Sequence, residues 1–327
     1  SIKSRSALGY IRTQNLPYHL KIVPLFLLVS YQFDQDALED FHSTMNKALA
    51  YVGEAIMRTI LWLKNAWEVF TNTSSKLNDK IKDIGKYVES GYGGNPEYEV
   101  KEGVEIKPEG MDDEKIYHAF QIDTAAIDPS AIEKAFEENE KEIEDFRNSV
   151  LGPIIKETTD LKAKTIEELS EFVGRYIYRN ADRKDEDKLK DEVKKAYEAP
   201  FISPIGDYGL LVEKNNPLDI KYYPGAYLFF DTTIRTGSSS DVVRMCKEVS
   251  GRYYRYYSTN SAVKGQIKTL EKLKDNKSGT AVDKKVVAFV TKLIMIFYRI
   301  ILESIRSGLK GTLLYLRLCG YDKGMSK

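Results

Sequence analysis

Hydrophobic residues recur at every third or fourth position over a long stretch near the start of the chain. These positions are Leu38, Phe41, Met45, Leu49, Val52, Ile56, Ile60, Leu63, Trp67 and Phe70. An α-helix has about 3.6 residues per turn, so this spacing places the side chains on one face of an amphipathic helix. The pattern continues in phase to Val88, across a polar run at 71–75 that could bend or break the helix. Glycines from Gly91 onward end it.

A second long amphipathic pattern covers residues 281–318 at the far end of the chain. Its centre, Val286 to Leu302, is strongly apolar but contains Lys292 and Arg299. Charges are costly inside a bilayer, so the pattern favours a core helix with a wide apolar face over a membrane span. Attachment of this basic helix to a membrane surface stays open. We expect the two ends of the chain to close one antiparallel bundle.

The region between these helices has mixed patterns. Residues 97–122 contain short apolar segments, among them Ile116 to Ile122, that are typical of extended chain. Leu210 to Val212 and Tyr222 to Asp231 are further candidate strands. We therefore expect one small antiparallel sheet that pairs parts of 97–122 with 208–234.

Other segments of the middle region predict helices. One begins at Asp128-Pro129-Ser130, where proline suits the first turn, and Gly152-Pro153 interrupts it before a further helix that runs to about residue 178. The densely charged stretch 179–195 predicts a solvated helix, and shorter helices follow at 240–257 and 261–274.

The fold class predicted is mainly α: a long antiparallel helical bundle with a small inserted antiparallel β-sheet, an α+β arrangement. We divide the chain into an N-terminal arm (1–33), a long amphipathic helix or helix pair (34–96), an acidic middle region with helices and the small sheet (97–236) and a basic C-terminal helical region that closes the bundle (237–327). The apolar run Ile22 to Val29 is too short to span a bilayer, so we expect the arm to pack on the bundle.

Charge is segregated along the chain although its formal net charge is zero. Residues 97–171 hold 22 acidic and 9 basic side chains, a balance of −13, whereas residues 244–327 hold 18 basic and 6 acidic ones, a balance of +12. These regions could pair within one fold, between copies or with other partners.

Residues with catalytic or ligand-binding chemistry are sparse. The three histidines, His19, His42 and His118, have no partner at a usual metal-ligand spacing, and the sequence has no nucleophile elbow, phosphate loop or dinucleotide fingerprint. We therefore expect no enzyme activity, no metal and no cofactor. Cys246 and Cys319 are too few for a disulfide framework, and Cys319 fits a small core residue.

Arginine and tyrosine alternate in the segment 251–257. Arg252, Tyr254, Arg255 and Tyr257 are candidates for nucleic-acid contact, because tyrosines can stack on bases and arginines can neutralise phosphates. The alternative is that this segment merely ends an amphipathic helix, in which Tyr253 belongs to the core.

The two helical ends also carry a resemblance. A long helix opens with Ala37 to His42, contains Ile60 to Leu63 and Trp67, and continues through the lysine-rich segment Lys76 to Lys86; the chain closes with the aliphatic helix Val286 to Leu302 and with Leu313 to Cys319. This pattern resembles the internal head, or inner-body, virion proteins of large tailed bacteriophages, over about a third of the chain. The resemblance implies a capsid protein trimmed by a prohead protease, and a chain that begins at Ser1 fits such processing.

The resemblance predicts a non-enzymatic structural virion protein inside the phage head. Its partners would be DNA, the capsid shell or other virion proteins, in an assembly that could be oligomeric. Ejection with the genome would bring it into contact with a membrane and into the host cytoplasm. Two alternatives stay open: a membrane-active helical protein, such as a pore component or toxin, and a hydrolase whose site is assembled from distant residues.

Overall fold

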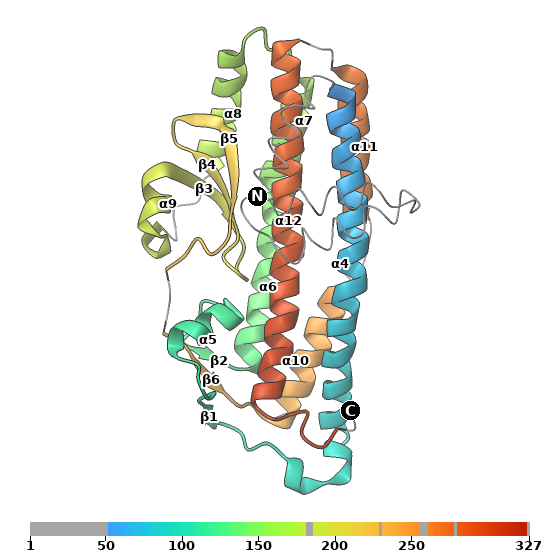
Figure 1. Cartoon of the computed structure of the whole chain (residues 1–327), viewed down its shortest axis with the longest axis vertical. Helices are drawn as coiled ribbons and strands as arrows, with labels where there is room; N and C mark the ends of the chain where they lie inside the picture. Colours follow the sequence, from blue (N-terminus) through green and yellow to red (C-terminus); the bar gives the residue numbers. More distant parts are fainter. Residues whose placement is uncertain (1–51, 181–185, 229–230, 255–260, 278–279, 326–327) are drawn as a thin grey trace, which may run out of the picture.

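The computed structural model describes residues 52–180, 186–228, 231–254, 261–277 and 280–325. The N-terminal arm, the first stripe residues Leu38 to Leu49 and the histidines His19 and His42 lie outside the described residues. The mainly helical fold predicted from the sequence is confirmed, and the two long amphipathic helices pack against each other along the molecule (Figure 1).

The first long helix, α4 (Val52–Glu89), is continuous through the polar run at 71–75. The hydroxyl groups of Thr71 and Thr73 donate hydrogen bonds to the carbonyls of Trp67 and Val69, one turn earlier on the same helix. Such bonds satisfy the hydroxyls within the helix, and the helix continues through this run. The predicted face from Ile56 through Phe70 to Val88 is buried.

The second long helix, α12 (Ala281–Leu318), has the bounds that the sequence predicts. Thr280 caps its start by accepting a hydrogen bond from the backbone amide of Asp283. α4 and α12 run parallel: Thr59 faces Met295 near one end, and Tyr87 donates a hydrogen bond to the carbonyl of Lys323 near the other. The expectation that the two chain ends run antiparallel is therefore wrong.

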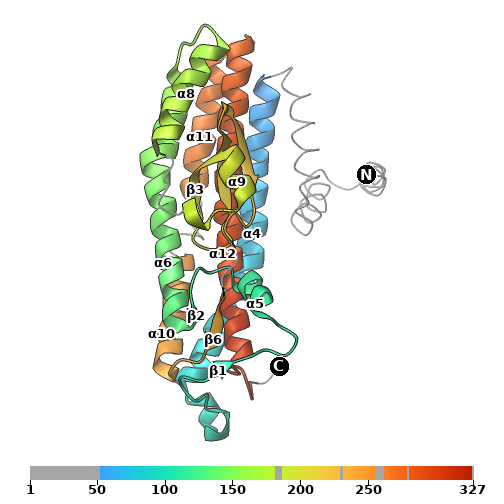
Figure 2. The same cartoon turned by 90° about the vertical axis from the view of Figure 1, so that its left-hand side faces the viewer.

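The antiparallel partners come from the middle of the chain. α6 (Pro129–Phe146), the π turn Arg147–Leu151 and α7 (Gly152–Asp160) run against α12, and α10 (Ser239–Arg252) and α11 (Ser261–Asn276) run against α4 (Figures 1 and 2). Between the two long helices, the chain returns along the bundle twice, once in α6 and α7 and once in α10 and α11. α12 therefore starts at the same end of the bundle as α4. The bundle as a whole is antiparallel.

Gly152-Pro153 does not interrupt the third helix as expected. The π turn leads directly into α7, with Pro153 in the first turn of α7. A π turn is wider than an α turn, which accommodates a residue that lacks an N–H donor. The helix instead ends at Asp160, and α8 (Ile166–Asn180) follows.

Two small sheets lie on one side of the bundle, where a single sheet was expected (Figure 2). In the first, β6 (Thr233–Arg235) pairs antiparallel with β1 (Glu105–Ile106) and parallel with β2 (Ala126–Ile127). The second is an antiparallel sheet of β3 (Tyr197–Ile202), β4 (Gly209–Glu213) and β5 (Asn216–Tyr223). Pairing between the regions 97–122 and 208–234 is thus limited to β1 with β6, because β4 is taken by its neighbours in sequence.

Three local predictions are wrong. Ile116 to Ile122 was expected to be extended, but α5 (Asp113–Phe120) occupies most of it, with Asp112 capping its first turn. The stretch 179–195 is not one solvated helix: its described part contains a short 3₁₀ turn (Glu186–Lys188) and the start of α9 (Asp191–Ala196). The candidate strand at 222–231 likewise ends at Tyr223.

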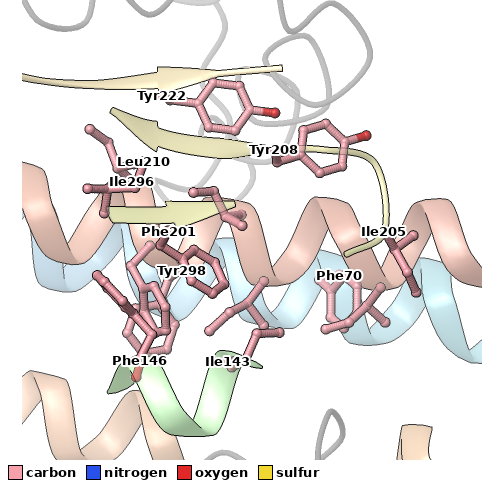
Figure 3. Packing of buried hydrophobic residues seen from close by; sticks show 14 of the residues in the cluster. Phe70, Ile143, Phe146, Phe201, Ile205, Tyr208, Leu210, Tyr222, Ile296 and Tyr298 are labelled. Carbon is pink, nitrogen blue, oxygen red and sulfur yellow. The ribbon is translucent and has the colours of Figure 1, made fainter. Parts of the chain in front are cut away.

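The sheet β3–β5 joins the bundle through one hydrophobic core. Figure 3 shows Phe146 of α6, Phe201 of β3 and Tyr298 of α12 among the side chains between these elements. The ring centroid of Phe297 lies 5.5 Å from that of Phe146 and 5.6 Å from that of Phe201. One aromatic cluster therefore connects the sheet to the bundle.

The sheet also covers polar side chains of α12. Arg299 is only 6% exposed, and its guanidinium carbon lies 3.7 Å from the ring centroid of Tyr222 on β5. Nearby, the Tyr208 and Ser307 hydroxyls lie 2.7 Å apart. Part of the polar side of the final helix therefore faces protein rather than solvent. Within the described residues, no helix has the length and apolar content needed to cross a membrane.

Candidate functional site: a cavity with a buried carboxyl group

The turn between β3 and β4 places Asp207 in an unusual backbone conformation. Its φ is +49°, in the left-handed region that glycine favours, and the preceding Gly206 has φ +84°. The turn is held by the Ser203 hydroxyl, which accepts a hydrogen bond from the Tyr208 amide at 3.1 Å. The Asp207 carbonyl accepts another from the Ala226 amide at 2.9 Å. Non-glycine residues in this region are often functional.

The Asp207 carboxyl is buried, with 2% of the residue exposed, and accepts a hydrogen bond from the hydroxyl of Tyr117 on α5. Burial raises the pKa of Asp207 to about 7, because the charged form loses hydration, while the Tyr117 hydrogen bond opposes this shift. The nearby Asp123 raises the pKa further, whereas Lys188 and Lys190 lower it. This carboxyl group therefore titrates near neutral pH.

An ion pair between two other residues lies beside the buried Asp207. The Lys188 ammonium lies 2.6 Å from Asp123 Oδ2, and both side chains are partly buried. Asp123 follows α5, and Lys188 ends the 3₁₀ turn before α9. An isolated bridge between Leu189 and Tyr227 holds this segment beside the sheet. Four segments distant in sequence thus meet around one carboxyl group.

These residues line a cavity of about 630 Å³ between α6, the segment after α5 and the edge strand β3. Its polar residues are Asp123, Thr124, Lys134, Glu138, Lys141, Glu142, Lys188, Asp207 and Tyr227. Leu189, Phe201, Ile202 and Pro204 contribute apolar wall. The volume is in the range of small-molecule sites, which are typically about 300–1,000 Å³. The arrangement can hold a small polar molecule with an apolar part, and Asp207 can exchange a proton with it.

The predicted nucleic-acid residues are only partly described. Arg252 forms an ion pair with Glu140 of α6, and each side chain is only 19% exposed. Tyr254 is 44% exposed, with the Lys82 ammonium 5.1 Å from its ring centroid. Arg255 and Tyr257 lie outside the described residues. Tyr253 is buried, as expected of a core residue.

The segregated charges meet across the bundle. Basic residues of the C-terminal region pair with acidic ones from earlier elements: Arg244 with Glu133, Lys247 with Glu89, Arg252 with Glu140, Lys272 with Asp160 and Lys292 with Asp219. Three of these pairs, at Glu133, Glu140 and Asp160, join the acidic region 97–171 to the basic region, so pairing within one fold accounts for part of the segregated charge.

The remaining candidate chemistry gives no second site. His118 is exposed and lies 3.6 Å from Glu114, one turn away on α5. Cys246 and Cys319 are free and buried, and Cys319 closes the core as predicted. Burial raises the pKa of both thiols to about 12. Among the described residues, no group of three or more His, Cys, Asp or Glu side chains is arranged to hold a metal ion.

Sequence patterns did not single out Asp207, Tyr117, Asp123 or Lys188. The one local signal was Pro204-Ile205-Gly206-Asp207 between two apolar segments, which predicts a turn but not a buried carboxyl group. Comparison of the chain with protein-family models, curated proteins and solved structures finds no match.

Proposed function

We propose that this chain is a non-enzymatic structural protein of a phage virion, packed inside the head. The proposal rests on the resemblance of its helical ends to internal head proteins and on the long bundle in which those ends pack together. The observation that carries most weight is the set of ion pairs across the bundle. They occupy basic side chains of the C-terminal region with acidic partners inside the same fold.

The same ion pairs bear on the partner. DNA binding relies on basic side chains that are free to neutralise phosphates. Arg252 and Arg244 are already paired with Glu140 and Glu133, so contact with DNA would have to replace these bonds. We propose that the main contacts are with the capsid shell or other internal proteins, rather than with DNA.

The location is tested on purified filled particles. Particles are treated with an external protease, washed and analysed by mass spectrometry before and after genome ejection. We expect peptides from α4 and α12 to survive in filled particles and to become cleavable once the particles are opened. Absence of the chain from particles, or its digestion in intact ones, would rule the proposal out.

The choice of protein partners over DNA is tested by measuring DNA binding before and after acidic partners of the arginines are removed. We expect no electrophoretic shift of duplex DNA by the purified chain at about 0.15 M salt, where surface charges are screened beyond roughly 8 Å. The double variant Glu133→Gln/Glu140→Gln removes the α6 partners of Arg244 and Arg252, while Arg244 keeps its ion pair with Asp241, and it should gain affinity. Glu137→Gln/Glu167→Gln has the same net charge, but no ion pair to α10 involves these residues in the described structure, so it should gain less. Tight binding by the unaltered chain would contradict the choice of protein partners.

A further inference from the structure

The cavity beside Asp207 has two unlike walls. Its apolar wall is formed by Leu189, Phe201, Ile202 and Pro204, from β3 and the segments around it. Asp207 belongs to the turn after β3 and is almost completely buried. Such a combination suits a molecule with a hydrocarbon part and one polar group, because each end finds a matching surface.

The charges around the cavity favour a cation as that polar group. Lys188 is paired with Asp123 at 2.6 Å, and Lys134 is paired with Glu138 at 3.6 Å. Asp207, in contrast, accepts a hydrogen bond from the neutral Tyr117 hydroxyl and forms no ion pair among the described residues. The cavity lining holds four carboxyl groups, Asp123, Glu138, Glu142 and Asp207, and three lysines, Lys134, Lys141 and Lys188, so acidic groups outnumber basic ones by one. A buried carboxylate is stabilised by an adjacent positive charge; Lys188 and Lys190 supply part of it, and a bound cation in direct contact would add to it.

We propose that this cavity binds a small primary organic ammonium ion, with its charged end against the Asp207 carboxylate and its hydrocarbon part against Phe201 and the neighbouring apolar residues. A bare metal ion is a poorer match, since it would leave the apolar wall unused. The cavity volume of about 630 Å³ matches a free small molecule. The site is independent of the structural role proposed above, and neither test depends on the other.

Tyr117 has a positioning role in this site. Its hydroxyl donates to Asp207 from α5 and so fixes the orientation of the carboxyl group. The other titratable groups that face Asp207 are Asp123 after α5, Lys188 and Lys190 before α9, and Tyr227 after β5. Asp123 and Lys188 neutralise each other, which leaves Asp207 as the group whose charge changes when a cation arrives.

Proton linkage gives the proposal a measurable signature. The pKa of Asp207 is about 7 without ligand, and an ammonium ion binds the ionised carboxylate. The ionised fraction rises from roughly one tenth at pH 6 to roughly nine tenths at pH 8, so affinity should rise by about tenfold over this range. A neutral ligand of the same shape should show no such dependence.

The probe is 2-phenylethylammonium, with neutral 2-phenylethanol as its match in shape. Titrations of the full chain are followed by isothermal calorimetry and by ligand-observed NMR at pH 6, 7 and 8. We expect the ammonium ion to bind at least tenfold more tightly than the alcohol at pH 8, and its advantage to shrink at pH 6. Equal binding of the two probes, or affinity that does not change with pH, would overturn the proposal.

Substitutions test whether the ammonium ion binds beside Asp207. Asp207→Asn should reduce ammonium affinity at least tenfold and remove its pH dependence, and Tyr117→Phe should weaken binding by a smaller factor. Glu138→Gln, which alters a carboxyl group of the same cavity lining that is already paired with Lys134, should change affinity less than threefold. Should Asp207→Asn fail to fold, the comparison of the two probes across pH in the unaltered chain still decides the question. Unchanged binding in a folded Asp207→Asn variant would contradict the assignment.

Discussion

The bundle and the sheet side of this molecule are stabilised by different chemistry. Where α4 packs on α12, most buried side chains are apolar, as at Ile56, Leu63 and Ile294, and the buried polar ones are small and uncharged, as at Thr59. On the sheet side, buried apolar residues alternate with buried polar groups, among them Asp207 and Arg299. Apolar contact is non-directional, whereas each buried polar group needs its own partner. The bundle therefore supplies stability, and the sheet side supplies specific chemistry that depends on it.

The largest expected effect comes from removing the residue that joins the two regions. Phe297 is completely buried on α12 and touches the rings of both Phe146 and Phe201. Phe297→Ala should lower the free energy of unfolding by about 5 kcal/mol, through lost burial and the cavity left behind. Urea denaturation followed by circular dichroism measures it. Leu61→Ala, at an exposed position of α4, should cost under about 1 kcal/mol; similar losses in both variants would contradict a shared core.

The second effect is a pH dependence of the free energy of unfolding that arises on the sheet side, at Asp207. The pKa of Asp207 is raised from 3.8 to about 7 in the folded protein, so the folded state holds its proton more tightly than the unfolded state. The stabilising contribution is complete below about pH 4 and is lost as pH rises through 7. It amounts to up to about 4 kcal/mol at 1.36 kcal/mol per pKa unit.

This contribution is isolated by comparing Asp207→Asn with the unaltered chain. Unfolding free energies are measured in urea at pH 5 and pH 8. The unaltered chain should lose more stability than the variant between these values, because the variant has no carboxyl group to ionise at this position. Equal losses would mean that Asp207 titrates in the folded protein as it does in the unfolded one.

The third effect probes how closely the bundle helices pack. A Cβ atom at Gly85 of α4 would lie 2.8 Å from Cβ of Cys246 on α10, whereas one at Gly265 of α11 meets nothing within 4 Å. Alanine favours helices over glycine by up to about 1 kcal/mol. Gly265→Ala should therefore stabilise the protein, while Gly85→Ala should destabilise it by about 1–2 kcal/mol because the helices must move apart. Thermal unfolding of both variants measures the difference. Stabilisation by both substitutions would show that α4 and α10 can move apart at little cost.

The smallest effect concerns the charge pairs across the bundle. A double-mutant cycle on Arg252 and Glu140 should give a coupling of about 1 kcal/mol, since both side chains are mostly shielded from solvent. The same cycle on Lys247 and Glu89, which are 63% and 51% exposed, should give less than about 0.5 kcal/mol. Equal couplings, or couplings that vanish alike at high salt, would contradict a difference in burial.

Predictability from sequence followed the same division. The bounds of α12 and the buried face of α4 were predictable because helical periodicity repeats over ten turns and records burial directly. Asp128 and Pro129 also marked the start of α6 correctly. The segment Ile116 to Ile122 was assigned wrongly, because a short apolar run is compatible with both strand and helix, and the cap at Asp112 decided for the helix. The site at Asp207 had no local pattern beyond a turn.

The sequence by itself determined that two long amphipathic helices are buried in protein and that acidic and basic regions are available to pair. Only the tertiary structure decided that α4 and α12 run parallel, that the acidic side chains of α6 meet the basic ones of α10, and that Asp207 lies buried beside Tyr117. The physical reason is the sequence distance over which the deciding interactions act. Periodicity reflects which side of a helix avoids water, whereas direction and partnership depend on contacts between residues far apart in the chain.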